Sequence, residues 1–248
     1  RRRHSVISSG ESFQLYHCPV TTDARKPIGQ SPHPGCRIEG FVLGPFETNS
    51  YVIYPAAAGA GSPCWIIDPS FDPGPLLDRI RELGLTPALL ILTHAHVDHI
   101  AGVNDVLQAF PRLRVLIHES EAAWLGDPAL NLGAAIGFFV TCRGPDGRLA
   151  EGDELEIAGA RWHVLHTPGH SPGGITLHNR EQHVAIVGDT LFAGSVGRTD
   201  FPGSDPRTLT DSIRRKLYTL PDETTIFPGH GPSSTIGREK HSNPFERG

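Results

Sequence analysis

The feature that most constrains this chain is a pattern of apolar runs that end in metal-binding residue types. Four such runs lead directly into short segments containing His or Asp, at 93–99, 166–170, 188–189 and 228–230. Continuous apolar runs are typical of strands buried inside an α/β protein. Active sites of such proteins form where the carboxyl ends of strands meet at one edge of a sheet. We therefore expect the four segments to converge on one site.

The first of these segments, T-H-A-H-V-D-H, is the densest in possible ligands. His94 and His96 are two residues apart and point to the same side of an extended backbone, while Asp98 and His99 lie at the turn into the next helix. Such a concentration of polar side chains has no packing role after a buried strand. Imidazole and carboxylate ligands suit Zn²⁺, and they also bind iron or manganese.

The supply of ligands indicates two metal ions. A catalytic site with one tetrahedral zinc ion needs only three protein ligands. This chain offers five imidazoles and two carboxylates, namely His94, His96, Asp98, His99, His170, Asp189 and His230. That set suits two ions about 3.5–4 Å apart, bridged by a carboxylate and a hydroxide. The other histidines are interpreted as structural.

Composition excludes several classes of protein. Among 248 residues, 22 Lys+Arg stand against 27 Asp+Glu, and the net charge of −5 argues against a nucleic-acid partner bound through a broad basic face. No apolar run approaches the ~18–20 residues of a membrane span, so no membrane partner is expected. The four cysteines form no C-x-x-C pair and are interpreted as free thiols, which favours a cytoplasmic location.

The chain divides into an irregular N-terminal arm over 1–36 and a catalytic domain over 37–248. Residues 126–150 are compatible with a loop and a short helix over a cleft. Clustered strands followed by a βα unit favour an α/β fold of two packed sheets with helices outside. The expected strands are 41–43, 51–54, 64–67, 88–92, 115–117, 154–157, 161–166, 174–178, 183–187 and 225–227, and the expected helices are 75–83, 101–110 and 206–218.

Four motifs resemble, in order and approximate spacing, those of the metallo-β-lactamase superfamily: T-H-A-H-V-D-H-I-A-G, T-P-G-H-S-P-G-G, G-D-T-L-F and F-P-G-H-G. The resemblance implies a four-layer αβ/βα sandwich of two mixed β-sheets with a dinuclear metal site at one edge. It implies a first metal site of His94, His96 and His170, a second of Asp98, His99 and His230, and Asp189 as the bridging carboxylate. Asp68 resembles the family aspartate that braces the metal loop; alternatively, it only ends a strand.

Within the superfamily the chain most resembles the short glyoxalase II-like thiolester hydrolases. The resemblance rests on G-D-T-L-F at 188–192, on G-R-T-D-F at 197–201 and on the tail at 235–245. The β-lactamases proper usually place a cysteine where Asp189 stands, which counts against antibiotic hydrolysis. The resemblance implies hydrolysis of a small-molecule thiolester, such as a hydroxyacylglutathione, by a hydroxide that two divalent metal ions activate. Zinc is favoured, with iron or manganese as alternatives.

In this scheme Asp98 and Asp189 hold the ions and orient the nucleophile. Arg198 is a candidate anchor for a substrate carboxylate, because its fork matches that group; alternatively, it is a structural partner of Asp200 or Asp205. The main alternative function is a mononuclear-iron persulfide dioxygenase of the same fold. The number and identity of the bound metals would distinguish the two activities.

Overall fold

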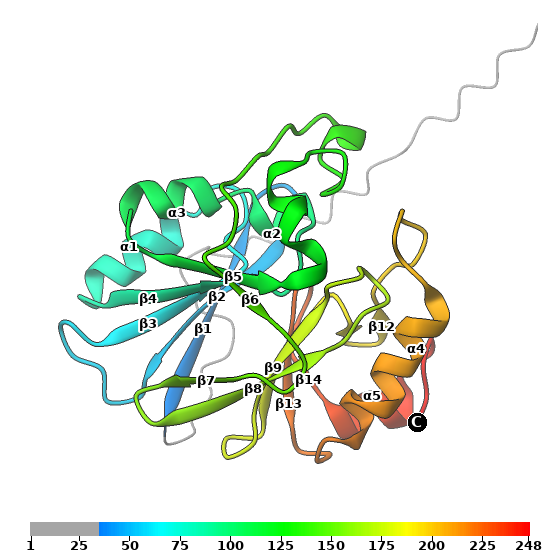
Figure 1. Ribbon diagram of the computed structural model, residues 1–248. Helices are drawn as coiled ribbons and strands as arrows, with labels where there is room; N and C mark the ends of the chain where they lie inside the picture. Colours follow the sequence, from blue (N-terminus) through cyan, green and yellow to red (C-terminus); the bar gives the residue numbers. More distant parts are fainter. Residues whose placement is uncertain (1–34) are drawn as a thin grey trace, which may run out of the picture.

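The computed structural model describes residues 35–248, so the expected N-terminal arm lies outside the described residues except for its last two positions. Two six-stranded sheets pack face to face, and helices cover their outer faces (Figure 1). Each sheet mixes parallel and antiparallel pairs. The predicted four-layer αβ/βα sandwich is therefore confirmed.

The first sheet contains six strands in chain order. Its first half is antiparallel: β1 (Cys36–Leu43), β2 (Thr48–Pro55) and β3 (Pro63–Ile67). Its second half continues in parallel: β4 (Thr86–Ile91), β5 (Arg114–His118) and β6 (Gly147–Leu149). Three helices belong to this half of the chain: α1 (Gly74–Glu82), α2 (Val97–Ile100) and α3 (Val103–Ala109). Two 3-10 segments follow β5: η1 (Glu119–Gly126) and η2 (Ala134–Ile136).

The second sheet reverses the chain order and is antiparallel except for one parallel pair. Its strands are β14 (Ser234–Thr235), β13 (Thr225–Pro228), β10 (Val184–Gly188), β9 (Ile175–Asn179), β8 (Ala160–His166) and β7 (Glu154–Ile157). A small hairpin joins β11 (Leu191–Phe192) and β12 (Ser195–Val196). The remaining elements are α4 (Pro206–Arg215), η3 (Leu217–Thr219) and α5 (Ile236–Ser242).

Three layers of buried side chains hold the sandwich together. Between the sheets, the rings of Trp65 and Trp162 meet edge to face at 6.2 Å. The outer face of the first sheet buries the apolar side of α1, including Leu76 and Ile80, which lie one helical turn apart. The outer face of the second sheet is covered by α4 and α5 (Figure 1).

The first strand is longer than predicted, beginning at Cys36 and not at Phe41. Glu39 interrupts its apolar pattern, yet this carboxylate is 1% exposed and hydrogen-bonds Tyr54 and Arg79. The apolar pattern therefore does not predict the first part of the strand, because the charged Glu39 within it is buried in an ion pair. The helix expected over 101–110 begins earlier, as α2 and α3. They meet at Gly102, where an added Cβ would lie 2.3 Å from the Ser70 carbonyl oxygen.

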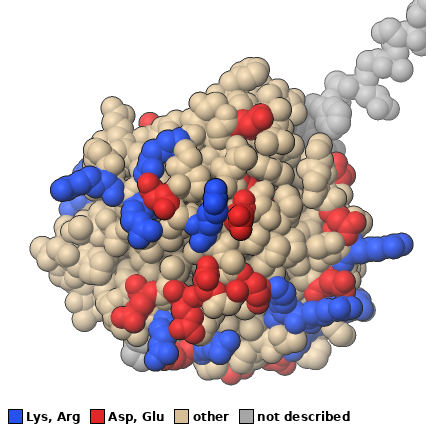
Figure 2. Space-filling model, viewed as in Figure 1, with Lys and Arg blue, Asp and Glu red and all other residues tan. Residues whose placement is uncertain are grey.

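Positive and negative side chains are interspersed on the face shown in Figure 2. Within residues 35–248, no helix combines the length and apolar character needed to cross a bilayer. The longest α-helix in this part of the chain, α4, has 10 residues.

Candidate metal centre

The four polar segments meet at one edge of the two sheets, as their positions after buried strands predict. His94 and His96 follow β4, and the next two candidates lie in α2. His170 follows β8, Asp189 follows β10 and His230 follows β13. The first sheet therefore contributes four candidates and the second sheet three.

One group of potential ligands consists of His94, His96 and His170, whose ligand atoms all lie within 4.8 Å of one another. Nδ1 of His96 is 2.9 Å from Nε2 of His170. The Arg198 carbonyl oxygen lies 2.8 Å from Nδ1 of His170, which leaves Nε2 of that ring facing the group. All three rings are buried.

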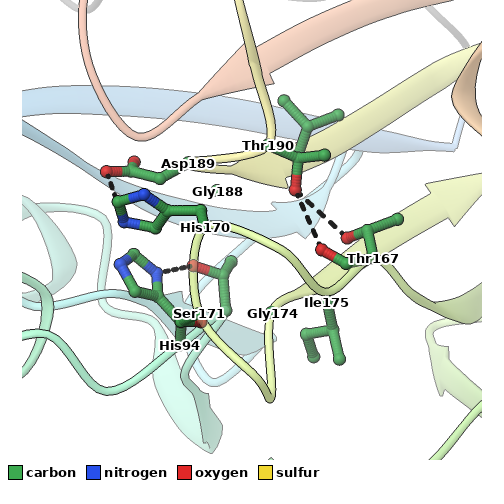
Figure 3. Close-up of a pocket in the computed structure, with 11 residues that line it drawn as sticks. His94, Thr167, His170, Ser171, Gly174, Ile175, Gly188, Asp189 and Thr190 are labelled. Carbon is green, nitrogen blue, oxygen red and sulfur yellow. Dashed lines mark hydrogen bonds and ion pairs between the residues drawn. The ribbon is translucent and has the colours of Figure 1, made fainter. Parts of the chain in front are cut away.

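A second group consists of Asp98, His99 and His230, again with ligand atoms within 4.8 Å. Asp189 lies between the two groups. Its carboxylate oxygens are 3.4 Å from Nε2 of His99 and 3.5 Å from Nε2 of both His170 and His230. Figure 3 shows His170 pointing at Asp189. The structure thus brings together all seven candidate ligands in the two groups that the resemblance implies.

The unpartnered atoms of this cluster fit divalent cations. Nε2 of His94, Nε2 of His99 and Oδ1 of Asp189 are buried without a hydrogen-bond partner. Leaving a buried polar atom unsatisfied costs about 1–3 kcal/mol, and several such atoms facing one another would be unfavourable without a cation between them. Nitrogen and oxygen donors of this kind suit zinc, iron or manganese. The residues present therefore fit a divalent metal centre.

The protonation states of the first histidine group and of Asp189 fit the role of ligands, whereas facing carboxylates, against the effect of burial, raise the pKa values of His99 and His230, which a bound cation would have to deprotonate. Burial, together with neighbouring imidazoles, holds the pKa of His94 well below its usual value and lowers the pKa of His96 to about 3. Burial opposes charge on Asp189, but the facing His99 lowers the pKa of this carboxyl to about 2. Neutral imidazoles and ionised carboxylates are the forms that bind metals.

Asp68 braces the first metal-binding loop. Its carboxylate accepts hydrogen bonds from the Thr93 backbone N–H at 2.7 Å and the Thr93 hydroxyl at 2.5 Å, and it lies 3.0 Å from Nδ1 of His99. The contact to Nδ1 leaves Nε2 of His99 directed at Asp98 and Asp189. Orienting a ligating imidazole through its other nitrogen is a common device of metal sites.

Two further positioning residues were missed by the sequence analysis. Glu121 is fully buried in η1 and accepts backbone hydrogen bonds from Ala95 at 2.5 Å and Gly173 at 2.6 Å, which joins the two His-bearing loops. Thr48 donates its hydroxyl to Asp98 at 2.9 Å. The only available signal for Glu121 was an acidic residue within the apolar stretch around Trp124.

A cavity of about 500 Å³ opens onto the cluster, with His96, Asp98, His170, Asp189 and His230 in its wall. The segment expected to cover a cleft does so, since residues between 129 and 136 line this cavity.

Arg198 also lines the cavity and is bound by Asp200 through two hydrogen bonds, of 2.9 and 2.7 Å. Asp205 has a different role, because its side chain accepts a hydrogen bond from the Thr208 backbone N–H at the start of α4. Arg198 was expected either to anchor a substrate carboxylate or to pair with Asp200 or Asp205, and the structure shows the pair with Asp200.

Comparison with known proteins identifies the class to which this fold and site belong. The sequence profile of the Metallo-beta-lactamase superfamily matches residues 43–230. The chain belongs to this superfamily.

Two curated relatives indicate the kind of activity. The chain is 39% identical over 208 residues to the probable metallo-hydrolase YqgX of Bacillus subtilis, and the aligned region covers 83% of this chain and 95% of the relative. It is 38% identical over 202 residues to the hydroxyacylglutathione hydrolase GloC of Haemophilus influenzae, and the aligned region covers 81% of this chain and 93% of the relative. The chain is a metallo-hydrolase of the metallo-β-lactamase fold.

Two solved structures agree with this fold over most of the chain. The BLEG-1 B3 metallo-beta-lactamase superposes with a TM-score of 0.80 at 39% identity, covering 85% of this chain and 100% of that structure. TTHA1623 in a di-iron-bound form superposes with a TM-score of 0.73 at 37% identity, covering 83% of this chain and 98% of that structure. At least one similar protein therefore holds two metal ions.

Proposed function

We propose that this chain hydrolyses thiolesters at a centre of two divalent metal ions, with a hydroxyacylglutathione as the first substrate to test. The observation that carries the proposal is the presence of two ligand groups with Asp189 between them. The similarity to GloC supports the thiolester as the substrate class. Zinc is the proposed metal, and the di-iron form of TTHA1623 makes iron the first alternative to measure.

The proposed chemistry assigns a task to each part of the site. Bound divalent ions lower the pKa of water toward ~7 and polarise a carbonyl group. Asp98 and Asp189 would hold the ions and orient the nucleophile, and their pKa values lie below the usual range despite burial, which keeps both carboxylates ionised. Water adds to the thiolester carbonyl and gives up one proton to solvent, the C–S bond breaks, and the thiolate leaves with the electron pair of that bond. Since a free thiol has a pKa of about 8.5, the leaving group needs no protein acid.

The loss of single ligands tests this proposal. His96→Ala and Asp189→Ala should each lower the metal content and decrease kcat/KM for a hydroxyacylglutathione by more than about 100-fold, since even partners behind the ligands account for 10–100-fold. Elemental analysis and a thiolester hydrolysis assay measure both effects. His241→Ala, on an exposed side chain of α5, is the matched control. Full hydrolysis by metal-depleted protein would refute the proposal.

The metal count separates this function from a mononuclear-iron persulfide dioxygenase. A single iron at His94, His170 and Asp189 would leave the complete group of Asp98, His99 and His230 unused. We therefore expect two metal ions per chain and no oxygen uptake. One iron per chain with oxygen consumption would favour the dioxygenase.

The cysteines support a cytoplasmic location as part of the proposal. Within residues 35–248, Cys36, Cys64 and Cys142 are free and buried. Disulfides persist in oxidising compartments and are rare in the cytosol, so free thiols are consistent with a reducing compartment.

A further inference from the structure

We propose that the preferred thiolester carries an apolar, uncharged group, on its acyl or its thiol side, that lies in the cavity next to the metal ligands. This inference rests on the proposed thiolester hydrolysis and specifies its substrate class. The cavity has a volume of about 500 Å³ and shares its wall with five of the seven candidate ligands. A group bound there is therefore attached close to the reacting carbonyl.

The wall away from the ligands is apolar. Phe46, Leu132, Ile136, Phe192 and Phe201 line it. Ile136 is 51% exposed and Phe46 is 38% exposed, so part of this apolar surface is open to water. Covering such surface with an apolar group is favourable, whereas a charged group would lose hydration without gaining a partner.

The segment that forms much of this wall carries no charge, and its one polar side chain that lines the cavity is hydrogen-bonded to the protein backbone. Residues 128–142 contain no Lys, Arg, Asp or Glu. Asn131 lines the cavity but is fully buried; its Nδ2 donates to the Val140 carbonyl at 3.0 Å, and its Oδ1 accepts from the Gly133 N–H at 3.0 Å. Its hydrogen-bonding groups therefore shape the loop and do not face a substrate.

Aromatic packing fixes the same segment against loops of the first sheet, next to the site. The ring of Phe138 lies 4.8 Å from that of Phe71 and 5.8 Å from that of Phe46, measured between centroids. The apolar wall is thus held in place before any substrate binds, as expected of a preformed binding site.

The single Lys or Arg among the cavity-lining residues of 35–248 is already paired. Asp200 binds the Arg198 guanidinium with two hydrogen bonds, and the guanidinium carbon lies 4.5 Å from the centre of the Phe201 ring. Asp200 occupies the Nε and Nη2 donors and balances the guanidinium charge, which leaves a substrate carboxylate only the Nη1 side of the group. Glutathione bears two carboxylates and an ammonium group, so this wall offers it little recognition beyond the thiolester itself.

A matched set of thiolesters tests the inference on the metal-loaded protein. The neutral reference is S-acetyl-N-acetylcysteamine. S-Hexanoyl-N-acetylcysteamine places an apolar group on the acyl side, S-acetyl-2-phenylethanethiol places one on the thiol side, and S-acetylglutathione supplies the charged thiol. We expect kcat/KM for at least one of the two apolar thiolesters to exceed that of the reference by at least about tenfold. For S-acetylglutathione we expect kcat/KM to exceed that of the reference by no more than about threefold.

A pair of variants in the same segment localises the effect. Ile136→Asp places a carboxylate in the apolar wall. We compare kcat/KM for the better of the two apolar thiolesters with kcat/KM for the neutral reference, and this ratio should fall by about tenfold in the variant. Leu130→Asp makes the same change at a neighbouring position that is 41% exposed and lies outside the cavity wall, and it should leave the ratio unchanged.

The outcomes distinguish this inference from the proposed function. Equal kcat/KM across the set, or a tenfold preference for S-acetylglutathione, would overturn the apolar substrate class and leave thiolester hydrolysis standing. No hydrolysis of any of the thiolesters by protein that holds two metal ions would overturn both.

Discussion

Glu121 illustrates how single residues that do not face the metals determine where the ligands lie. Its carboxylate is fully buried, and its two oxygens accept hydrogen bonds from the backbone of Ala95, between two ligands, and of Gly173, beyond a third. Burial raises the pKa of this carboxyl, although these backbone hydrogen bonds oppose the shift. One side chain therefore fixes the distance between loops that come from different sheets.

Glu121→Gln should weaken metal binding without unfolding the protein. The amide keeps one oxygen for one N–H donor but presents an NH₂ group to the other donor. Partners that orient metal ligands typically account for 10–100-fold in affinity, and we expect a loss of about that size. Competition between the protein and a chelator of known affinity measures it. Glu119→Gln, at an exposed position in the same 3-10 segment, is the control, and equal affinities in both variants would contradict the prediction.

His178 should make the stability of the protein depend on pH. Burial, with the Arg180 charge as a secondary cause, lowers the pKa of this strand residue to about 4. The unfolded chain binds the proton near pH 6.5. Between these values only the unfolded state is protonated, so the free energy of unfolding falls as the pH falls from 6.5 to 4, by roughly 2–3 kcal/mol.

Denaturant unfolding of the wild type and His178→Gln across this pH window checks the prediction. The two proteins share every metal-binding histidine, so the difference between their pH profiles reports on His178. We expect the variant to lose part of the decrease between pH 6.5 and pH 4. Parallel profiles would show that His178 does not cause it.

At the scale of elements, the site depends on how closely the ends of two neighbouring strands approach. Gly229, directly after β13, donates its N–H to the Gly188 carbonyl at the end of β10 at 2.8 Å. A Cβ at Gly229 would lie 2.0 Å from Oδ1 of Asp189 and 2.7 Å from Cε1 of His99. Only a residue without a side chain leaves room for Asp189 between the two ligand groups.

Gly229→Ala should therefore displace Asp189 and damage the centre. Shifting a catalytic group by about 1 Å can cost roughly 100-fold in rate, and we expect a decrease in kcat/KM of that order together with a lower metal content. Gly144→Ala is the matched control, because nothing lies within 4 Å of its added Cβ. Normal activity and metal content in Gly229→Ala would show that Asp189 tolerates the displacement.

The elements that the sequence predicted correctly are those whose apolar pattern coincides with burial. β10 is predicted by its continuous apolar run, which agrees with the burial of every residue from Val184 to Gly188. α1 is predicted because its apolar residues follow the helical repeat. β6 and α5 were not predicted, since the former has three residues and the latter only one large apolar residue, Ile236. Their positions depend on pairing with β5 and on packing against η3, which local patterns do not contain.

The same distinction applies to the site. The seven candidate ligands were found because several occur together and all follow strand ends. The segment at 126–150 was expected over the cleft, but the aromatic part of the cavity wall was not found, since residues such as Phe46 and Phe192 are apolar like any core residue and come from distant parts of the chain. Only the tertiary structure shows that they face a cavity.

At the scale of the whole molecule, the metal centre lies across the junction of the two sheets. The first sheet supplies four of the ligands and the second sheet three. Backbone hydrogen bonds also join the sheets at this edge, from Asn49 to Gly229 at 2.7 Å and from Ile175 to Thr93 at 2.9 Å. Bound metals would therefore connect the two halves of the sandwich as well as create the reactive site.

This position predicts that metal removal lowers the stability of the entire fold. A ligand present at 1,000 times its Kd stabilises the native state by about 4 kcal/mol, provided that the unfolded chain does not bind it. For a chain of this size each kcal/mol corresponds to about 2–4 °C, so a chelator should lower Tm by roughly 10 °C. Scanning calorimetry of metal-loaded and chelated protein measures the shift. Asp189→Ala, treated with the same chelator, should show a much smaller change, because it has less metal to lose. A wild-type Tm that is indifferent to chelation would mean that the sheets hold together without the metals, and that the ligands serve the chemistry alone.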